Sequence, residues 1–167
     1  KTSTARALSS LRNFYRFLER SGRGQNAAVQ SIRNPRLPQS TPKPLAPDDA
    51  MAVLENADAW QDEPWLGKRN LALFTLLYGC GLRISEALSL CRADLDGEVL
   101  RVTGKGSKTR MVPLIPAVRT HIESYLGLCP FKLTPSQPLF RGVKGGVLSP
   151  RLIQLRVAQL RGALGLP

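Results

Sequence analysis

The stretch that decides the fold is Gly79-Cys80-Gly81-Leu82-Arg83-Ile84-Ser85-Glu86-Ala87-Leu88. The run before it, residues 71–78, is almost entirely apolar and predicts a buried helix that the two glycines interrupt. A second helix is expected to begin near Leu82. The first turn of a helix has free N–H groups and a partial positive charge, so an arginine at position 83 suits a bound anion.

Arg83 is followed three residues later by Glu86, so on a helix the two side chains lie on one side and the carboxylate can orient the guanidinium. The apolar residues of this helix can be buried on another side. Two interpretations stay open at this point. Arg83 is either a phosphate-binding arginine that Glu86 holds in place, or half of an ordinary exposed ion pair, which contributes roughly 0.3–0.5 kcal/mol.

A β-hairpin is predicted downstream, with residues 98–102 and 109–114 as its two short strands. Its turn reads Gly104-Lys105-Gly106-Ser107-Lys108. Glycine on either side of Lys105 lets the backbone bend tightly and approach a partner closely. The spacing does not fit a P-loop, which needs four residues between its first glycine and Gly-Lys-Ser/Thr. The alternatives are a lysine that contacts phosphate and a solvated hairpin tip.

Composition indicates a nucleic-acid partner. The 167 residues include 24 Lys and Arg against 12 Asp and Glu, giving a net charge of +12 and a pI near 10.5, the electrostatic footprint of a DNA or RNA binder. The three cysteines are odd in number and unpatterned, which argues against a disulfide framework and a zinc site. With no signal peptide and no long apolar span, the chain is expected to be cytoplasmic and not membrane-bound.

The chain is expected to have two parts joined by a linker. Residues 1–33 are helical, residues 34–47 form a proline-rich extended linker, and residues 48–167 form the larger domain. In the first part, an apolar stripe of Leu8, Leu11, Tyr15 and Leu18 is predicted, with Arg12 and Arg16 along a different, basic face. In the second part, Met51, Val53 and Leu54 are predicted to face inward, and Ser149 is predicted to cap a helix that contains Arg151.

Several segments together resemble the tyrosine recombinases, and within them the Xer group of bacterial chromosome-dimer resolvases. The most specific are Gly81-Leu82-Arg83-Ile84-Ser85-Glu86 and Gly104-Lys105-Gly106-Ser107-Lys108-Thr109-Arg110-Met111-Val112-Pro113-Leu114. The others are residues 4–18, 34–45, 138–140 and 162–167. Each segment is weak alone, but their joint order and spacing are highly specific and run along almost the whole chain.

The resemblance implies a fold and a reaction. It implies a mainly α-helical catalytic domain with a small antiparallel sheet, incomplete at its end, preceded by the last helices of a helical core-binding domain. It also implies cutting and rejoining of double-stranded DNA through a 3′-phosphotyrosyl intermediate, with no metal and no other cofactor, in chromosome dimer resolution and segregation. A related recombinase would share the site in a tetramer.

The resemblance also assigns roles to residues. Arg83 would pair with the scissile phosphate, Lys105 would be the general acid and Glu86 would orient Arg83. Contacts to DNA are expected from Arg12, Arg16, Lys108, Arg110 and Arg151.

The family's His-x-x-Arg box and its tyrosine nucleophile follow a segment like Gly165-Leu166-Pro167, where this sequence stops. The sequence is therefore expected to be a fragment that is inactive alone. His121 is predicted to be a partly buried structural histidine, and Tyr15, Tyr78 and Tyr125 lack the context of the nucleophile. The alternative is a non-catalytic DNA-binding module on the same scaffold. An RNA-binding protein is less favoured, because no stacking motif and no GXXG clamp is present.

Overall fold

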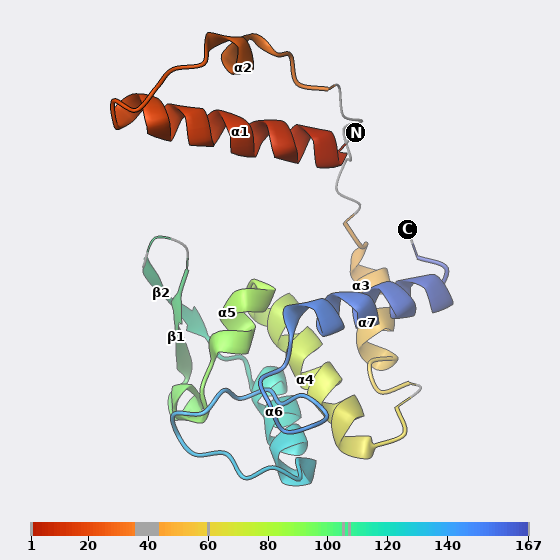
Figure 1. The fold of residues 1–167 in the computed structure, drawn as a ribbon. Helices are drawn as coiled ribbons and strands as arrows, with labels where there is room; N and C mark the ends of the chain where they lie inside the picture. The colour runs from red at the N-terminus through yellow and green to blue at the C-terminus, as the bar shows by residue number, and fades with distance from the viewer. Residues whose placement is uncertain (1, 36–43, 60, 105, 107, 167) are drawn as a thin grey trace. The chain divides into compact units, whose positions relative to one another are not determined.

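The structure is a computed structural model, which describes residues 2–35, 44–59, 61–104, 106 and 108–166. The chain divides into two compact units, residues 1–43 and 44–167. Helices dominate, and the sheet found in the described residues has two antiparallel strands, so the predicted fold class is confirmed (Figure 1). Residues 36–43 of the predicted linker lie outside the described residues.

The first unit contains α1 (Thr2–Arg20) and the short α2 (Ala27–Ser31). The Arg12 side chain joins them, because its guanidinium donates to the carbonyls of Val29 and Ile32. Of the predicted apolar stripe on α1 only Leu8 is buried, and Leu11 is exposed. A helix of five residues covers little of a helix of nineteen, so most of the stripe stays open.

The second unit holds the remaining elements. They are α3 (Pro47–Glu55), α4 (Pro64–Cys80), α5 (Ile84–Ser89), the 3₁₀ helix η1 (Arg92–Leu95), β1 (Val99–Thr103), β2 (Thr109–Pro113), α6 (Pro116–Leu128) and α7 (Pro150–Ala163). Figure 1 shows the hairpin at one edge of this unit, next to α5.

The centre of this unit is α4, whose middle turns are buried on all sides. Leu73 and Leu76 are fully buried, and α6 packs along the helix. Residues 71–78 are helical as predicted, but the buried part of the helix ends before Tyr78, which is 53% exposed. Gly79 lies within α4 instead of interrupting it, and the helix ends at Gly81, whose φ of +61° is in the left-handed region that favours glycine.

The hairpin follows the predicted strands closely. Leu100 pairs with Val112 and Val102 pairs with Arg110. Leu100, Val102 and Val112 are all buried, so this face of the hairpin packs on the core. Residues directly opposite each other in an antiparallel pair share a face. Arg110 therefore points to the same side as the buried Val102.

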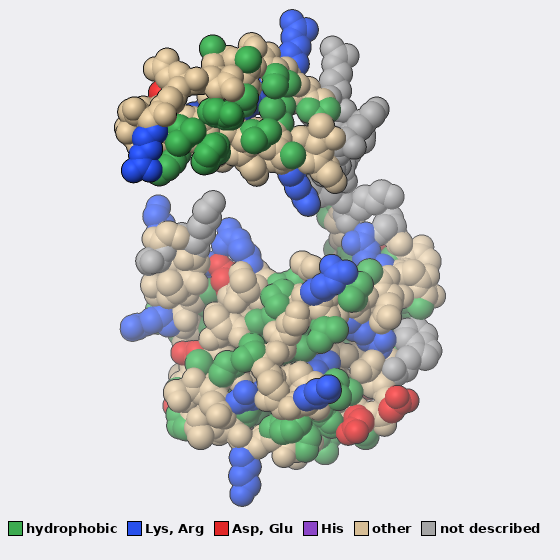
Figure 2. Space-filling model, in the orientation of Figure 1, with side chains coloured by type: hydrophobic (Ala, Val, Ile, Leu, Met, Phe, Trp, Pro, Cys, Tyr) green, Lys and Arg blue, Asp and Glu red, His purple; other side chains and the backbone are tan. Residues whose placement is uncertain are grey.

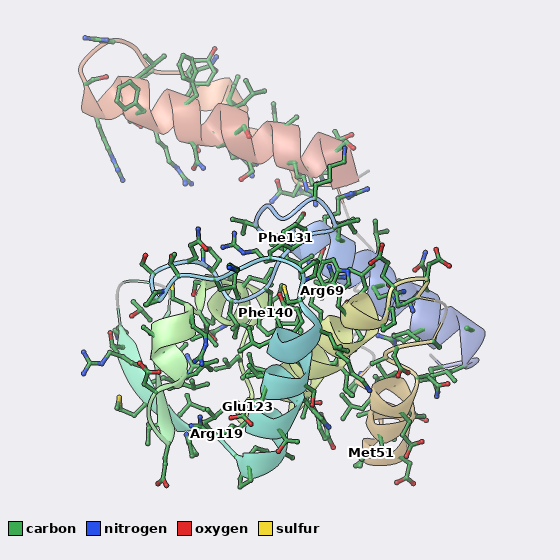
Figure 3. The ribbon with its side chains drawn as sticks, turned by 90° about the horizontal axis from the view of Figure 1, so that it is seen from below. Met51, Arg69, Arg119, Glu123, Phe131 and Phe140 are labelled. Carbon is green, nitrogen blue, oxygen red and sulfur yellow. The ribbon has the colours of Figure 1, made fainter. Side chains whose placement is uncertain are left out.

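Helices α3 and α7 pack against each other. One prediction about α3 is wrong. Val53 is buried as expected, but Met51 is 48% exposed and lies on the outer side of α3 (Figure 3). A nine-residue helix that contacts only one side of the domain has room for few inward positions. Ser149 occupies the predicted cap position of α7, but its backbone carbonyl, not its side chain, accepts from Leu152.

An arginine is part of the core of this unit. Arg69, on α4, is only 7% exposed, and its guanidinium lies 5.6 Å from the centre of the Trp65 ring. It donates to the Asn70 side-chain oxygen and, over 2.9 Å, to the backbone carbonyl of Arg141. Burial lowers the pKa of Arg69. Figure 3 shows this side chain in the interior, in the region of Phe140. Arg69 thus ties α4 to the chain that follows Phe140.

Candidate active site

The N-terminus of α5 presents Arg83 to solvent. After Gly81 ends α4, the buried Leu82 anchors the chain, and Arg83 takes the N-cap position with extended backbone angles (φ −71°, ψ 152°). The Arg83 side chain is 72% exposed. The predicted helix start is therefore right to within two residues, and Arg83 stands where free backbone N–H groups and the helix dipole favour an anion.

Glu86 is the buried partner of this arginine. Its side chain is only 3% exposed. One oxygen, Oε2, accepts the backbone N–H of Arg83 at 2.8 Å, and the other, Oε1, accepts Nη1 of Arg83 at 2.9 Å. The carboxylate thus completes the helix N-terminus and fixes the guanidinium. The interpretation of these residues as an ordinary exposed ion pair is wrong, because the acidic partner lies inside the protein.

A second arginine binds the same carboxylate. Arg110, on β2, donates from Nη1 to Oε1 and from Nη2 to Oε2 of Glu86, each over 2.9 Å. Each oxygen of Glu86 thereby accepts two hydrogen bonds from the described residues. Arg110 was predicted to contact DNA, whereas the structure places its guanidinium in a two-pronged pair with Glu86, the strongest form of this interaction.

The alternation of the sequence could have revealed this position. Arg110, Val112 and Leu114 alternate along the strand, and the last two are buried. A period of two places all three on one face, which is the face toward the core. An arginine in line with buried residues needs an acidic partner, and the predictions overlooked that requirement.

These contacts set the charge of the site. The hydrogen bonds from Arg110 and then from Arg83 lower the pKa of Glu86 to about 2, against the opposing effect of burial. Glu86 in turn raises the pKa of Arg110. At neutral pH the three side chains are two cations and one anion, so the cluster keeps a net positive charge. Both arginines reach solvent, Arg83 more than Arg110, with side chains 72% and 42% exposed.

The turn of the hairpin lies against this cluster. A side chain at Gly104 would place its Cβ 3.1 Å from Oε1 of Glu86. The N–H of Gly104 donates to the carbonyl of Lys108 over 2.9 Å and closes the turn. Gly104 thus lies close to Glu86 within the protein, and the close approach of the turn to a binding partner stays a prediction. Lys105, the predicted general acid, lies outside the described residues, one position after Gly104.

The remaining predicted DNA contacts lie apart in the chain. Lys108 is exposed at the start of β2, and Arg151 is exposed in the first turn of α7. Arg16 is exposed on α1, in the other unit. Arg12 has structural partners, since Nη1 also donates to the Asn34 side chain at 2.8 Å. DNA contact by these residues stays a prediction.

His121 and Tyr125 make structural contacts. His121 is half-buried, and its Nδ1 shares a hydrogen bond of 3.0 Å with the Thr75 hydroxyl, as predicted. Tyr125 is fully buried and donates to the carbonyl of Leu139, and burial raises its pKa. Tyr15 is half-buried on α1.

Three further features bear on the predictions from composition. The three cysteines are free thiols. Among the residues that the structure describes, no group of three or more His, Cys, Asp or Glu could hold a metal ion. No helix in the described part of the chain is long and apolar enough to cross a membrane.

Comparison with known proteins identifies close relatives. The model of the phage integrase family matches residues 43–167. The tyrosine recombinase XerC of Rhizobium meliloti is 49% identical over 164 residues, which cover 97% of this chain and 52% of the relative. XerC of Mesorhizobium japonicum is 51% identical over 165 residues, covering 97% and 53% respectively. The chain thus spans about half the length of the curated relatives it matches.

Solved structures agree with the sequence relatives. The XerH recombinase in a pre-cleavage complex with its difH substrate gives a TM-score of 0.60 at 26% identity, over 75% of this chain and 38% of XerH. The XerA recombinase gives 0.61 at 23% identity, over 96% of this chain and 54% of XerA. A lambda integrase dimer on a core site gives 0.69 at 16% identity, over 96% and 45%. The last two support the fold alone.

Proposed function

This chain belongs to the phage integrase family, and from that premise we propose that the whole protein is a site-specific DNA recombinase of the tyrosine type. It cuts and rejoins DNA through a 3′-phosphotyrosyl intermediate and acts in the cytoplasm, in chromosome dimer resolution and segregation. The support is the identity of about half of all positions with XerC proteins over 97% of the chain.

One observation supports the catalytic part of this proposal most directly. Arg83 is 72% exposed, yet its guanidinium is held by a carboxylate that is 3% exposed. An arginine that is fixed in this way and open on its outer side can pair with the non-bridging oxygens of a phosphate. Negative charge on those oxygens grows as the phosphorus becomes pentacoordinate, so a fixed cation stabilises the transition state more than the substrate.

Lys105 is proposed as the general acid. When the tyrosine oxygen attacks phosphorus, the bond from phosphorus to the 5′-oxygen breaks, and that oxygen takes up a proton from the lysine. Gly104, the residue before Lys105, lies beside Glu86, which supports placing acid and arginine at one phosphate. We assign the nucleophile to none of Tyr15, Tyr78 and Tyr125.

Duplex DNA is the proposed partner, with Lys108, Arg151 and Arg16 as candidate contacts to its backbone. The net charge of +12 supports this. Figure 2 shows Lys and Arg side chains spread over one face of residues 44–167, where Asp and Glu are few. The related lambda integrase has been seen as a tetramer bound to a Holliday junction, and we propose a tetramer with a related recombinase here.

The test compares Arg83→Ala with the wild type in the whole protein. A nicked suicide duplex, with a site recovered by binding selection from random duplexes, traps the covalent protein–DNA complex. Loss of a transition-state cation should slow trapping by roughly 10²–10³-fold. Arg101→Ala, which removes an exposed arginine from the same hairpin, is the control. Binding without any covalent complex in the wild type would contradict the proposal and favour the non-catalytic alternative.

A further inference from the structure

We propose that Arg110 is a positioning residue for the reaction, which acts on Arg83 through Glu86 and does not contact DNA. The inference rests on the proposed function of Arg83. It replaces the expectation that Arg110 is one more cation along the DNA backbone.

The contacts show how the effect would pass from one arginine to the other. The two nitrogens of Arg110 each bind a different oxygen of Glu86 at 2.9 Å, so this pair fixes the plane of the carboxylate. Arg83 donates one side-chain hydrogen bond and one backbone hydrogen bond to that same carboxylate. If Arg110 is removed, the donors that remain to the carboxylate among the described residues are those of Arg83, and the carboxylate can turn. The exposed guanidinium then loses its fixed direction.

On the hairpin, Arg110 is on the same face as the buried Val102 and Arg101 is on the other face, while the Arg110 side chain remains 42% exposed. Arg110 pairs with Val102, which is buried, whereas Arg101 pairs with Met111, which is exposed. Both arginines belong to the same two strands and bear the same charge. Arg101 is therefore a matched control, because it is an arginine of the same hairpin without the hydrogen bonds to Glu86 that Arg110 makes.

The same contacts connect the hairpin to α5. Arg110 joins β2 to the first turn of α5, and Gly104 at the end of the opposing strand lies against the same carboxylate. The hairpin, whose turn contains Lys105, is thus attached at Glu86 to the helix that presents Arg83. One buried carboxylate thus connects β2 to the first turn of α5.

The Arg110→Lys substitution tests whether the charge of Arg110 or its two-pronged geometry matters. Lysine keeps the positive charge but presents a single ammonium group, which cannot bind two oxygens in a fork. Displacement of a reacting group by about 1 Å can lower a rate by about 10²-fold. Arg110→Lys should therefore slow cleavage at saturating DNA by roughly 10–100-fold while leaving DNA affinity within about twofold. Arg101→Ala should cleave at nearly the wild-type rate.

The experiment measures suicide-substrate cleavage and DNA affinity for the whole protein and its Arg110→Lys, Arg110→Ala, Arg101→Ala and Arg83→Ala variants. A second substrate has a methylphosphonate at the scissile position, which removes the charge that Arg83 would meet. If Arg110 acts through Arg83, the defect of its variants should shrink to within about threefold on this neutral substrate. A merely structural role would give the same defect on both substrates.

The outcomes are distinct. Equal defects on the two substrates, a wild-type rate for Arg110→Lys, or a loss of affinity in Arg110→Ala that Arg110→Lys restores would each overturn the inference. If Arg83→Ala is slow and Arg110→Lys is not, the inference fails and the proposed function stands. If Arg83→Ala cleaves like the wild type, the proposed function fails, and the inference fails with it.

Discussion

Two arginines in this protein are held by neighbouring side chains in opposite ways. Arg69 is buried, and its acceptors are neutral oxygens of Asn70 and Arg141. Arg83 is exposed, and its acceptor is a buried carboxylate that a second arginine also binds. The N–H groups of Arg69 bind oxygens inside the protein, whereas much of the Arg83 side chain is open to solvent. The difference indicates that an exposed arginine with a buried anchor is available to a ligand, and of the two arginines on Glu86 the more open is Arg83, whose side chain is 72% exposed against 42% for Arg110.

The largest effect should come from Lys105, the proposed general acid. In the whole protein, Lys105→Ala should lower the cleavage rate by roughly 10²–10⁴-fold, with DNA affinity nearly unchanged. Lys108→Ala should do the reverse, since Lys108 is exposed at the start of the returning strand. The measurement is trapping of the covalent complex, together with binding to the same duplex.

A sulfur substrate tests the role of Lys105 further. Replacing the 5′-bridging oxygen by sulfur gives a leaving group that scarcely needs a proton. This substrate should restore cleavage by Lys105→Ala. An equal defect on both substrates would mean that Lys105 is a positioning contact and not the general acid.

The second-largest effect should be a loss of stability when the buried Arg69 is replaced. Arg69→Met keeps an apolar stem but leaves the carbonyl of Arg141 and the Asn70 oxygen without these donors. The free energy of unfolding of the chain should fall by about 2–3 kcal/mol. Arg83→Ala should lower it by less than about 1 kcal/mol, because that side chain is largely solvated. Denaturant titration measures both, and a larger loss for Arg83→Ala would reverse the comparison.

The same contrast shows what the sequence could predict. The hairpin and the Arg83–Glu86 pair were predictable because they depend on local spacing, the alternation of a strand and the three-residue separation on a helix. The hydrogen bond from Arg69 to the carbonyl of Arg141 was not, because Arg141 lies 72 residues away in the chain. The approach of Arg110 to Glu86 likewise depends on how the hairpin packs on α5.

The errors have a common physical cause. Met51 and Tyr78 lie on helices with apolar sides and were expected to be buried, but both are exposed. Periodicity tells which residues share a side of a helix, not how far a neighbouring element extends along it. Leu11 on α1 is exposed for the same reason.

The third effect is the pH dependence of stability, and it arises from Glu86. Its pKa is about 2 in the folded chain against 4.5 without these contacts. A lowered pKa stabilises the fold above pH 4.5, and this contribution is lost as the pH falls through 2. Glu86→Gln should therefore show a shallower loss of stability in acid than the wild type. The control is Glu123→Gln, at an exposed position on α6 (Figure 3), and equal acid profiles for the two variants would contradict the assignment to Glu86.

The smallest effect concerns the salt dependence of DNA binding, and it tests which charges face the DNA. The chain should bind duplex DNA with little sequence preference, and its affinity should fall steeply with salt as counterions are released. Arg151 is exposed, so Arg151→Ala should weaken binding only a few-fold and reduce the slope of log affinity against log salt by about one. Arg83→Ala should weaken binding slightly.

The buried arginine supplies the control for that titration. Arg69→Met, measured at a temperature where it remains folded, also removes one positive charge, yet that charge lies in the core, bound to oxygens of the protein itself. It should leave the salt slope unchanged, because only a cation that approaches phosphate closely displaces a counterion. If Arg69→Met and Arg151→Ala reduced the slope equally, net charge alone would govern binding. The distinction between buried and exposed arginines would then have no consequence for DNA.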